Sequence, residues 1–306
     1  MENRVDEQKK ILVLVDGSER SLNTIRYVAD FAPFKGMQVV LFNVFHKIPD
    51  YYWDLTNEPM MAGRGGYMAS WEHQNKGLID RFMEKSVAML RTSGFKQDDI
   101  KLRIDNLKKG VTRDIIAEAG NGYAAVIARR RGFTRVPGIL MGSVADKLMV
   151  SLDFVPLFFA GVEPVSERIL IAMDNSESAM EAVKFVAKIA GKSDCFVTLF
   201  HVVREGDIFA DDLYGVNSEG RSIMLKVFEA SRNYLSEGGF KLENINNKVI
   251  TGTGSRAGTI AMFAAEGGYS TIVMGRKGVS SVKEFFLGRV SKKVIYAAHN
   301  RTVCIV

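Results

Sequence analysis

Two related stretches, ILVLVDGSE at residues 11–19 and ILIAMDNSE at residues 169–177, set the architecture of this chain. In each, a short apolar run that includes β-branched residues ends at an aspartate, Asp16 or Asp174, and a helical spacing of apolar residues follows. A run that is apolar at consecutive positions is typical of a strand buried on both faces of a parallel sheet. Each half of the chain is therefore predicted to open with a buried strand, a turn and a helix.

The remaining motifs also occur twice and in the same order, which indicates a duplicated domain. The matching pairs are QVVLFNVF (38–45) with FVTLFHVV (196–203), AAVIARRRG (124–132) with STIVMGRKG (270–278), and MGSVADKLM (141–149) with LGRVSKKVI (287–295). The polar stretch GVEPVSER (161–168) joins the two copies. The predicted domains span residues 1–162 and 167–306.

Composition narrows the class of protein. The 306 residues are 47% hydrophobic and 25% charged with 6 prolines, as in ordinary globular chains. Two cysteines and four scattered histidines supply neither a disulfide framework nor a metal-ligand spacing, so no metal site is predicted. No apolar stretch approaches the roughly 18–20 residues of a membrane helix, and the charged N-terminus lacks a signal core. We expect a soluble cytoplasmic protein whose net charge of +6 attracts anions only weakly.

Apolar runs alternate with helical patterns along both copies, which predicts an α/β fold of two domains with doubly wound parallel sheets. Each copy is expected to hold five strands and a long helix, at residues 71–93 or 219–237. A capping box at Ser178 and Glu181 is expected to open the first helix of the second copy. Ligands of such sheets bind at the carboxyl ends of the strands. Asp16 and Asp174 stand there, where a carboxylate either accepts ribose hydroxyls or caps the next helix.

A loop suited to phosphate follows the fourth predicted strand of each copy. The second copy reads Gly275-Arg276-Lys277-Gly278, nine residues, then Gly288-Arg289-Val290-Ser291, and the first reads Arg129-Arg130-Arg131-Gly132, nine residues, then Gly142-Ser143-Val144. Glycines allow a close backbone approach, the free N–H groups of a helix start face an anion, and hydroxyl and cationic side chains add hydrogen-bond donors. The repeated spacing indicates a shared backbone geometry in the two copies.

These linked features resemble the universal stress protein family in its tandem-domain form, over about residues 10–160 and 168–306. The resemblance implies two flavodoxin-like, adenine-nucleotide-hydrolase-like domains and binding of ATP, AMP or ADP, with a role for Mg²⁺ left open. It implies that Asp16 and Asp174 hold ribose and that Val44 and Val202 read adenine through their backbone. The phosphate-loop residues that it implies are Gly132, Gly142, Ser143 and Val144 in the first copy and Gly275, Gly278, Gly288, Val290 and Ser291 in the second, and we add Lys277 as a cation.

Both copies depart from the family pattern. Arg129 replaces the first glycine of the first copy and would either crowd the phosphate or clasp it, and Arg289 replaces the usual hydroxyl residue of the second. Because the second copy keeps all three glycines, the sequence favours it slightly as the more competent site. The arginines at 129–131 are interpreted as loop residues that face phosphate or solvent, since no aromatic interleaving suggests specific nucleic-acid binding. His46 and His201 are interpreted as structural, and Cys304 as buried.

The last strand of each copy, VPLFFA or RTVCIV, would leave an exposed apolar edge. The resemblance implies that these strands pair, which makes the chain an intrachain pseudo-dimer and leaves open whether two chains form a homodimer. Residues 50–71 are either a partner-binding or gating loop or a lid over the first helix.

The leading functional hypothesis is a nucleotide-binding stress regulator with an unidentified protein partner and no catalytic residues. Slow ATP hydrolysis, and a non-nucleotide interaction module with degraded loops, remain the alternatives.

Overall fold

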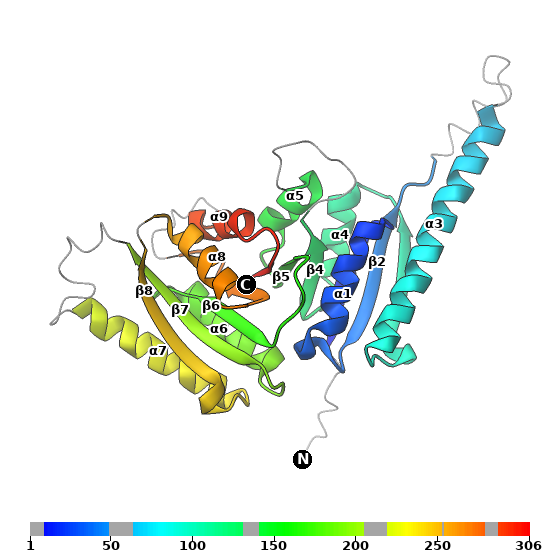
Figure 1. Cartoon of the computed structure of the whole chain (residues 1–306). Helices are drawn as coiled ribbons and strands as arrows, with labels where there is room; N and C mark the ends of the chain where they lie inside the picture. The colour runs from blue at the N-terminus through cyan, green and yellow to red at the C-terminus, as the bar shows by residue number, and fades with distance from the viewer. Residues whose placement is uncertain (1–8, 49–63, 131–140, 205–218, 253, 279–286) are drawn as a thin grey trace.

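The computed structural model describes residues 9–48, 64–130, 141–204, 219–252, 254–278 and 287–306, and it contains a ten-stranded sheet (Figure 1). The strand order is β3-β2-β1-β4-β5-β10-β9-β6-β7-β8. The strands are β1 (Lys10–Leu14), β2 (Gln38–Phe45), β3 (Ile100–Asn106), β4 (Ala125–Arg129), β5 (Leu157–Ala160), β6 (Arg168–Ala172), β7 (Phe196–Arg204), β8 (Ile245–Gly252), β9 (Thr271–Met274) and β10 (Thr302–Ile305).

Pairing is parallel within each copy and antiparallel at one place, between β5 and β10, where Phe159 faces Val303. This arrangement confirms the predicted fold class and the pseudo-dimer. The terminal strands are buried because each covers the apolar edge of the other.

Helices cover both faces of the sheet. The first core lies between the sheet and α1 (Leu22–Asp30), α3 (Arg64–Thr92), α6 (Glu177–Ala190) and α7 (Glu219–Glu237). The second lies between the other face and α4 (Val111–Ala119), α5 (Ser143–Ser151), α8 (Arg256–Glu266) and α9 (Arg289–Ala297). Each core contains buried residues of both copies, so the two copies form continuous hydrophobic cores across their junction.

Two local predictions need correction. The predicted capping box at Ser178 is wrong, because α6 begins two residues earlier and Ser176 is its N-cap, with a hydroxyl that accepts a hydrogen bond from the Ala179 N–H. The long helix of the first copy begins at Arg64 rather than at residue 71. Part of the segment 50–71 is therefore helical, and residues 49–63 lie outside the described residues.

An exchange of arginines ties the two copies together. Arg130, which follows β4, donates to the carbonyl oxygens of Ala298 at 2.8 Å and of Arg301, just beyond α9. Arg276, at the equivalent position after β9, donates to the carbonyl oxygens of Met149 at 2.7 Å and of Leu152, at the end of α5. Each guanidinium thus satisfies orphan carbonyls at a helix end in the other copy.

Burial changes the role that the sequence suggested for Arg130. It is 7% exposed, so it faces neither phosphate nor solvent as expected, and Arg276 is 8% exposed at the equivalent place. Burial lowers the pKa of Arg130 to about 10, and the side chain stays protonated at neutral pH. Arg131 lies outside the described residues.

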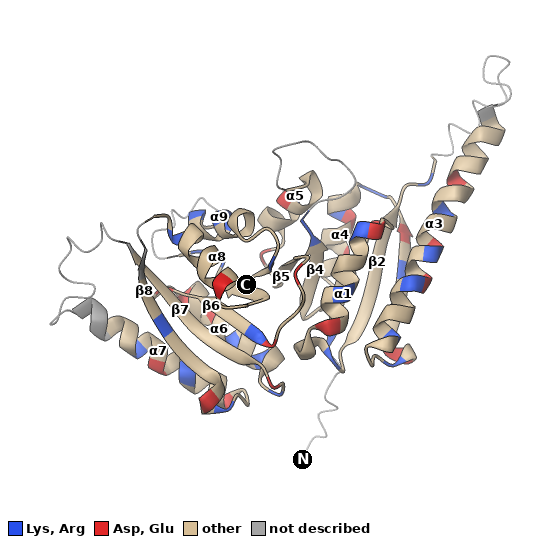
Figure 2. Cartoon of the chain, viewed as in Figure 1, with Lys and Arg blue, Asp and Glu red and all other residues tan. Residues whose placement is uncertain are grey.

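Surface charge is mixed, as the composition indicates. Figure 2 shows basic and acidic side chains interspersed along α3 and α6. In the part of the chain that the structure describes, no helix combines the length and the apolar character needed to cross a membrane.

Candidate nucleotide site

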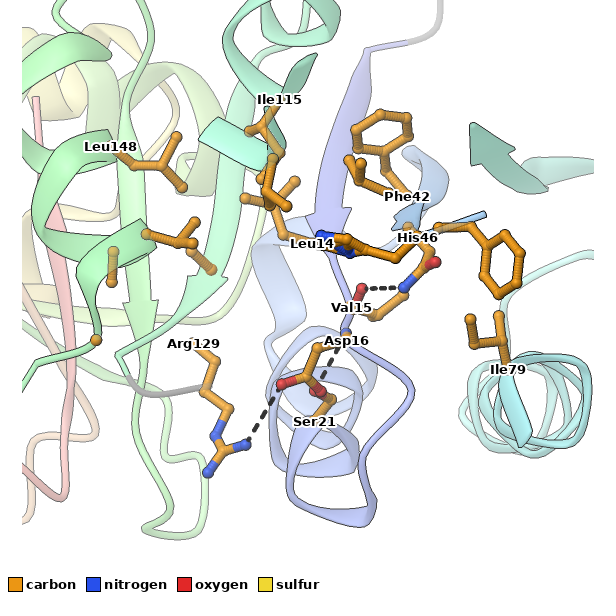
Figure 3. Close-up of a pocket in the computed structure, with 18 of the residues that line it drawn as sticks. Leu14, Val15, Asp16, Ser21, Phe42, His46, Ile79, Ile115, Arg129 and Leu148 are labelled. Carbon is orange, nitrogen blue, oxygen red and sulfur yellow. Dashed lines mark hydrogen bonds and ion pairs between the residues drawn. The ribbon is translucent and has the colours of Figure 1, made fainter. Parts of the chain in front are cut away.

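A cavity of about 750 Å³ opens at the carboxyl ends of β1, β2 and β4 in the first copy (Figure 3). Its floor is mainly apolar and its polar groups stand at the strand ends and at the start of α5. The lining residues include Leu14, Asp16, Ser21, Phe42, Asn43, Val44, His46, Trp71, Asn75, Ile79, Ile115, Arg129, Gly142, Ser143, Val144 and Leu148. The structure therefore places five residues of the predicted first-copy site, together with Arg129, around one cavity. They are Asp16, Val44, Gly142, Ser143 and Val144. Gly132 lies outside the described residues.

The turn after β1 fixes the carboxylate of Asp16. Gly17 has a φ of +75°, a conformation that side chains rarely adopt, and it turns the chain sharply into the following helix. The Oδ1 atom of Asp16 accepts hydrogen bonds from the Ser18 N–H at 3.0 Å and from the hydroxyls of Ser18 and Ser21. One carboxylate oxygen thus holds the turn that leads into the helix, whose caps are Ser18 and Ser21 rather than Asp16 itself.

Arg129 faces that other oxygen. Its Nη1 atom lies 4.0 Å from Asp16 Oδ2 and 3.3 Å from the Ser18 hydroxyl, and Figure 3 shows the side chain directed toward the aspartate. Burial lowers the pKa of Arg129, and the nearby aspartate opposes that shift. The Arg129 side chain extends from the end of β4 toward Asp16, so a cation and a carboxylate lie close together at the cavity wall.

The start of α5 supplies backbone donors. Gly142 is the N-cap of this nine-residue helix, and its own N–H donates to the Arg130 carbonyl oxygen at 2.7 Å. Ser143 and Val144 begin the helix and line the cavity, and Ser143 is exposed. The free N–H groups and positive dipole end of such a helix favour an anion.

Helix α3 forms a wall that the sequence did not reveal. Trp71, Asn75 and Ile79 line the cavity from this helix. They recur every four residues, a signal visible in the sequence, but the same spacing serves equally to pack a helix on a sheet. Only the path of α3 over the turn at Gly17 directs these residues into the cavity.

In the second copy the loop after β9 packs against the strand-end acid. A Cβ atom at Gly278 would lie 2.8 Å from Asp174 Oδ2, so this backbone sits directly on the carboxylate. The Ser176 hydroxyl lies 3.2 Å from the Lys277 carbonyl oxygen, and the Lys277 N–H donates to the Ser178 hydroxyl at 3.1 Å. These bonds hold the loop on the start of α6, while the Lys277 side chain is exposed.

Two residues that favoured the second copy, Gly275 and Ser291, also have a role in the fold. A Cβ atom at Gly275 would lie 2.4 Å from the Ser178 carbonyl carbon, so this glycine allows close packing on α6. The buried Ser291 hydroxyl donates to the Gly275 carbonyl oxygen at 2.9 Å, which commits it within the protein. Arg289 is exposed at the start of α9, Val290 is half-buried beside it, and Val202 is buried on β7.

The two histidines near the second strands do not occupy equivalent positions. His201 lies within β7 and its counterpart is Asn43 on β2, not His46, which lines the cavity just beyond the strand. The Asn43 amide donates to the Val15 carbonyl oxygen at 2.8 Å, and the His201 Nδ1–H donates to the Met173 carbonyl oxygen at 2.8 Å. Both side chains thus tie the second strand to the first at the same level, a structural role for His201.

We expect His201 to make stability depend on pH. Burial lowers its pKa, while the bond to Met173 and the charge of Asp174 oppose that shift and Arg256 adds to it. Below the unfolded pKa of about 6.5 the unfolded chain binds a proton that folded His201 does not, so the free energy of unfolding falls as pH falls. His201→Asn, which installs the residue of the first copy, is expected to flatten this decline, by up to about 1.4 kcal/mol per pH unit.

Urea denaturation at pH values between 5 and 7 measures the effect. The control is His73→Asn, because His73 is exposed on α3. Parallel stability curves for His201→Asn and the parent protein would show that His201 does not titrate differently on folding.

The site offers little to a metal ion. Among the described residues no group of three histidine, cysteine, aspartate or glutamate side chains is placed to hold one. Asp16, the carboxylate among the described lining residues, already bonds to two hydroxyls and faces Arg129. The residues present therefore do not form a Mg²⁺ site of their own.

The fold and the strand-end site define a class, a tandem α/β protein whose flavodoxin-like halves pair through their last strands. The model of the universal stress protein family matches residues 7–153 and 166–305, and the chain belongs to this family.

Individual relatives agree with that assignment. Universal stress protein YxiE of Bacillus subtilis is 29% identical over 138 residues, 42% of this chain and 90% of the relative. Universal stress protein MJ0577 of Methanocaldococcus jannaschii is 29% identical over 153 residues, 46% of this chain and 94% of the relative. Among solved structures, a universal stress protein from Archaeoglobus fulgidus covers 98% of both chains with a TM-score of 0.62 and 22% identity, which shows the shared two-copy fold.

Proposed function

We propose that this protein binds ATP or a related adenine nucleotide in the cavity of its first copy and acts as a stress-response regulator. The observation that carries the proposal is the convergence of Asp16, Val44, Arg129 and the start of α5 on one cavity. A carboxylate suits ribose hydroxyls, an apolar strand end suits a base, and an arginine beside a helix N-terminus suits phosphate. The volume of about 750 Å³ suits a ligand of that size.

A regulatory role is favoured over efficient catalysis because the Asp16 carboxylate is already bonded within the protein. A general base must reach the proton that it removes, and Asp16 instead holds two serine hydroxyls while facing Arg129. Nucleotide binding would shift a conformation or a partner interaction only where the two states differ in nucleotide affinity. The two free, buried cysteines favour the cytoplasm as the site of action.

The second copy is proposed as the weaker nucleotide site. Its loop already lies against Asp174, and Arg289 stands where the first copy has Ser143. Binding there would require the loop to give up the bonds between Lys277 and α6.

Mass spectrometry of small molecules released from freshly purified, denatured protein tests the proposal. We expect adenine nucleotide at about one equivalent per chain, a prediction for the single favoured site. Asp16→Asn, which retains a capping oxygen, should lower the occupancy strongly, whereas Asp174→Asn should leave it unchanged. Protein that releases no nucleotide and binds none at millimolar ATP would instead support a non-nucleotide module.

A further inference from the structure

One face of helix α3 forms part of the wall of the proposed site. Trp71, Asn75 and Ile79 lie four residues apart and line the cavity. A Cβ atom at Gly17 would lie 3.1 Å from Ile79 Cγ1, so the helix presses on the turn that carries Asp16. Figure 3 shows Ile79 on α3 beside this part of the cavity.

That contact fixes the position of Trp71. Two helical turns separate it from Ile79, about 12 Å along the helix axis at 1.5 Å per residue. Figure 1 shows α3 continuing beyond the end of β2, and Trp71 lies toward its N-terminal end. The indole is thus held near the cavity mouth by a helix that is anchored at its middle.

The ring of Trp71 has room for a ligand. Its residue is 42% exposed although it lines a cavity, and within the described part of the chain no aromatic ring stacks on it. Val44, Phe45 and His46 line the same cavity from the end of β2. A flat heteroaromatic group between the strand end and the indole would cover apolar surface on both of its faces.

We propose that Trp71 is a base-stacking residue of the first-copy site and that the ligand it selects carries a planar nitrogenous base. This inference rests on the proposed function and adds a residue outside the family motif. Asn75, one turn nearer the floor, offers both a donor and an acceptor to the edge of such a base. Asp16, Arg129 and the start of α5 then receive the sugar and phosphate.

The experiment compares two probes that differ only in the base, AMP and ribose 5-phosphate. Isothermal titration on the full chain should show that Trp71→Ala weakens AMP binding by roughly five- to a hundredfold, the range for loss of one aromatic–base stack. Ribose 5-phosphate should bind Trp71→Ala and the parent equally. Trp71→Phe should lose less, and Tyr67→Ala, on the same helix at 76% exposure and outside the lining residues, should match the parent.

Fluorescence provides a readout at the indole itself. The sequence has two tryptophans, so Trp53→Phe leaves Trp71 as the single emitter. AMP should change its emission with the same dissociation constant as the titration, and ribose 5-phosphate should not. Circular dichroism confirms that each variant is folded.

The outcomes separate this inference from the proposed function. AMP binding that Asp16→Asn removes but Trp71→Ala changes less than twofold overturns the stacking and leaves the nucleotide site standing. AMP binding that survives Asp16→Asn and leaves the emission unchanged places the ligand elsewhere and overturns both. A parent protein that binds neither probe likewise overturns both.

Discussion

The substitution Gly142→Val is expected to weaken adenine-nucleotide binding by about 100-fold or more, the cost of losing two or more charge-assisted hydrogen bonds to phosphate. Gly142 has a φ of −79°, which valine adopts without strain, so the main change is the added side chain. That side chain is added at the N-cap of α5, where Gly142 lines the cavity beside the first free N–H groups of the helix. Isothermal titration with ATP measures the loss.

Gly288→Val is the matched control in the second copy. Gly288 is the N-cap of α9 with a φ of −65°, and a Cβ atom there would lie 3.2 Å from the Arg276 carbonyl oxygen. We expect little change in binding to the first copy. If Gly288→Val removes binding and Gly142→Val does not, the nucleotide occupies the second copy, and Gly278→Val should then also weaken binding because its side chain would press on Asp174.

The second large effect concerns stability. Arg130→Ala is expected to lower the free energy of unfolding by about 2–4 kcal/mol, because it leaves the carbonyl oxygens of Ala298 and Arg301 without their donors in a buried place. The same loss is expected for Arg276→Ala, which frees the carbonyl oxygens of Met149 and Leu152. For a chain of 306 residues such a loss lowers the melting temperature by about 3–6 °C.

Differential scanning calorimetry without nucleotide measures the change. Arg113→Ala is the control, since Arg113 is exposed on α4, and it should stay within about 0.5 kcal/mol of the parent. Arg130→Lys should be intermediate, because a single ammonium cannot reproduce the two-pronged guanidinium geometry. A melting temperature for Arg130→Ala equal to that of Arg113→Ala would show that the exchanged arginines do not support the pairing of the copies.

The strand pattern and the duplication were legible in the sequence because buried parallel strands must be apolar at consecutive positions. The runs at 11–15 and 169–173, followed by Asp16 and Asp174, indicated two α/β domains and put acids at strand ends. Helix boundaries were less accurate. The N-cap of α6 is Ser176 rather than Ser178, since either serine has suitable capping chemistry and the turn after β6 selects between them.

Roles that depend on side-chain direction were decided only by the tertiary structure. Arg129 and Arg130 are adjacent in sequence, yet one faces Asp16 and the other crosses to the second copy, because neighbouring residues at a strand end point to opposite sides. Ser291 and Gly275 are predicted ligand-binding residues, and only the structure shows that they also serve the packing of α9 and α6. Trp71 reaches the cavity because α3 crosses the turn at Gly17, a contact between residues far apart in the chain that no local pattern encodes.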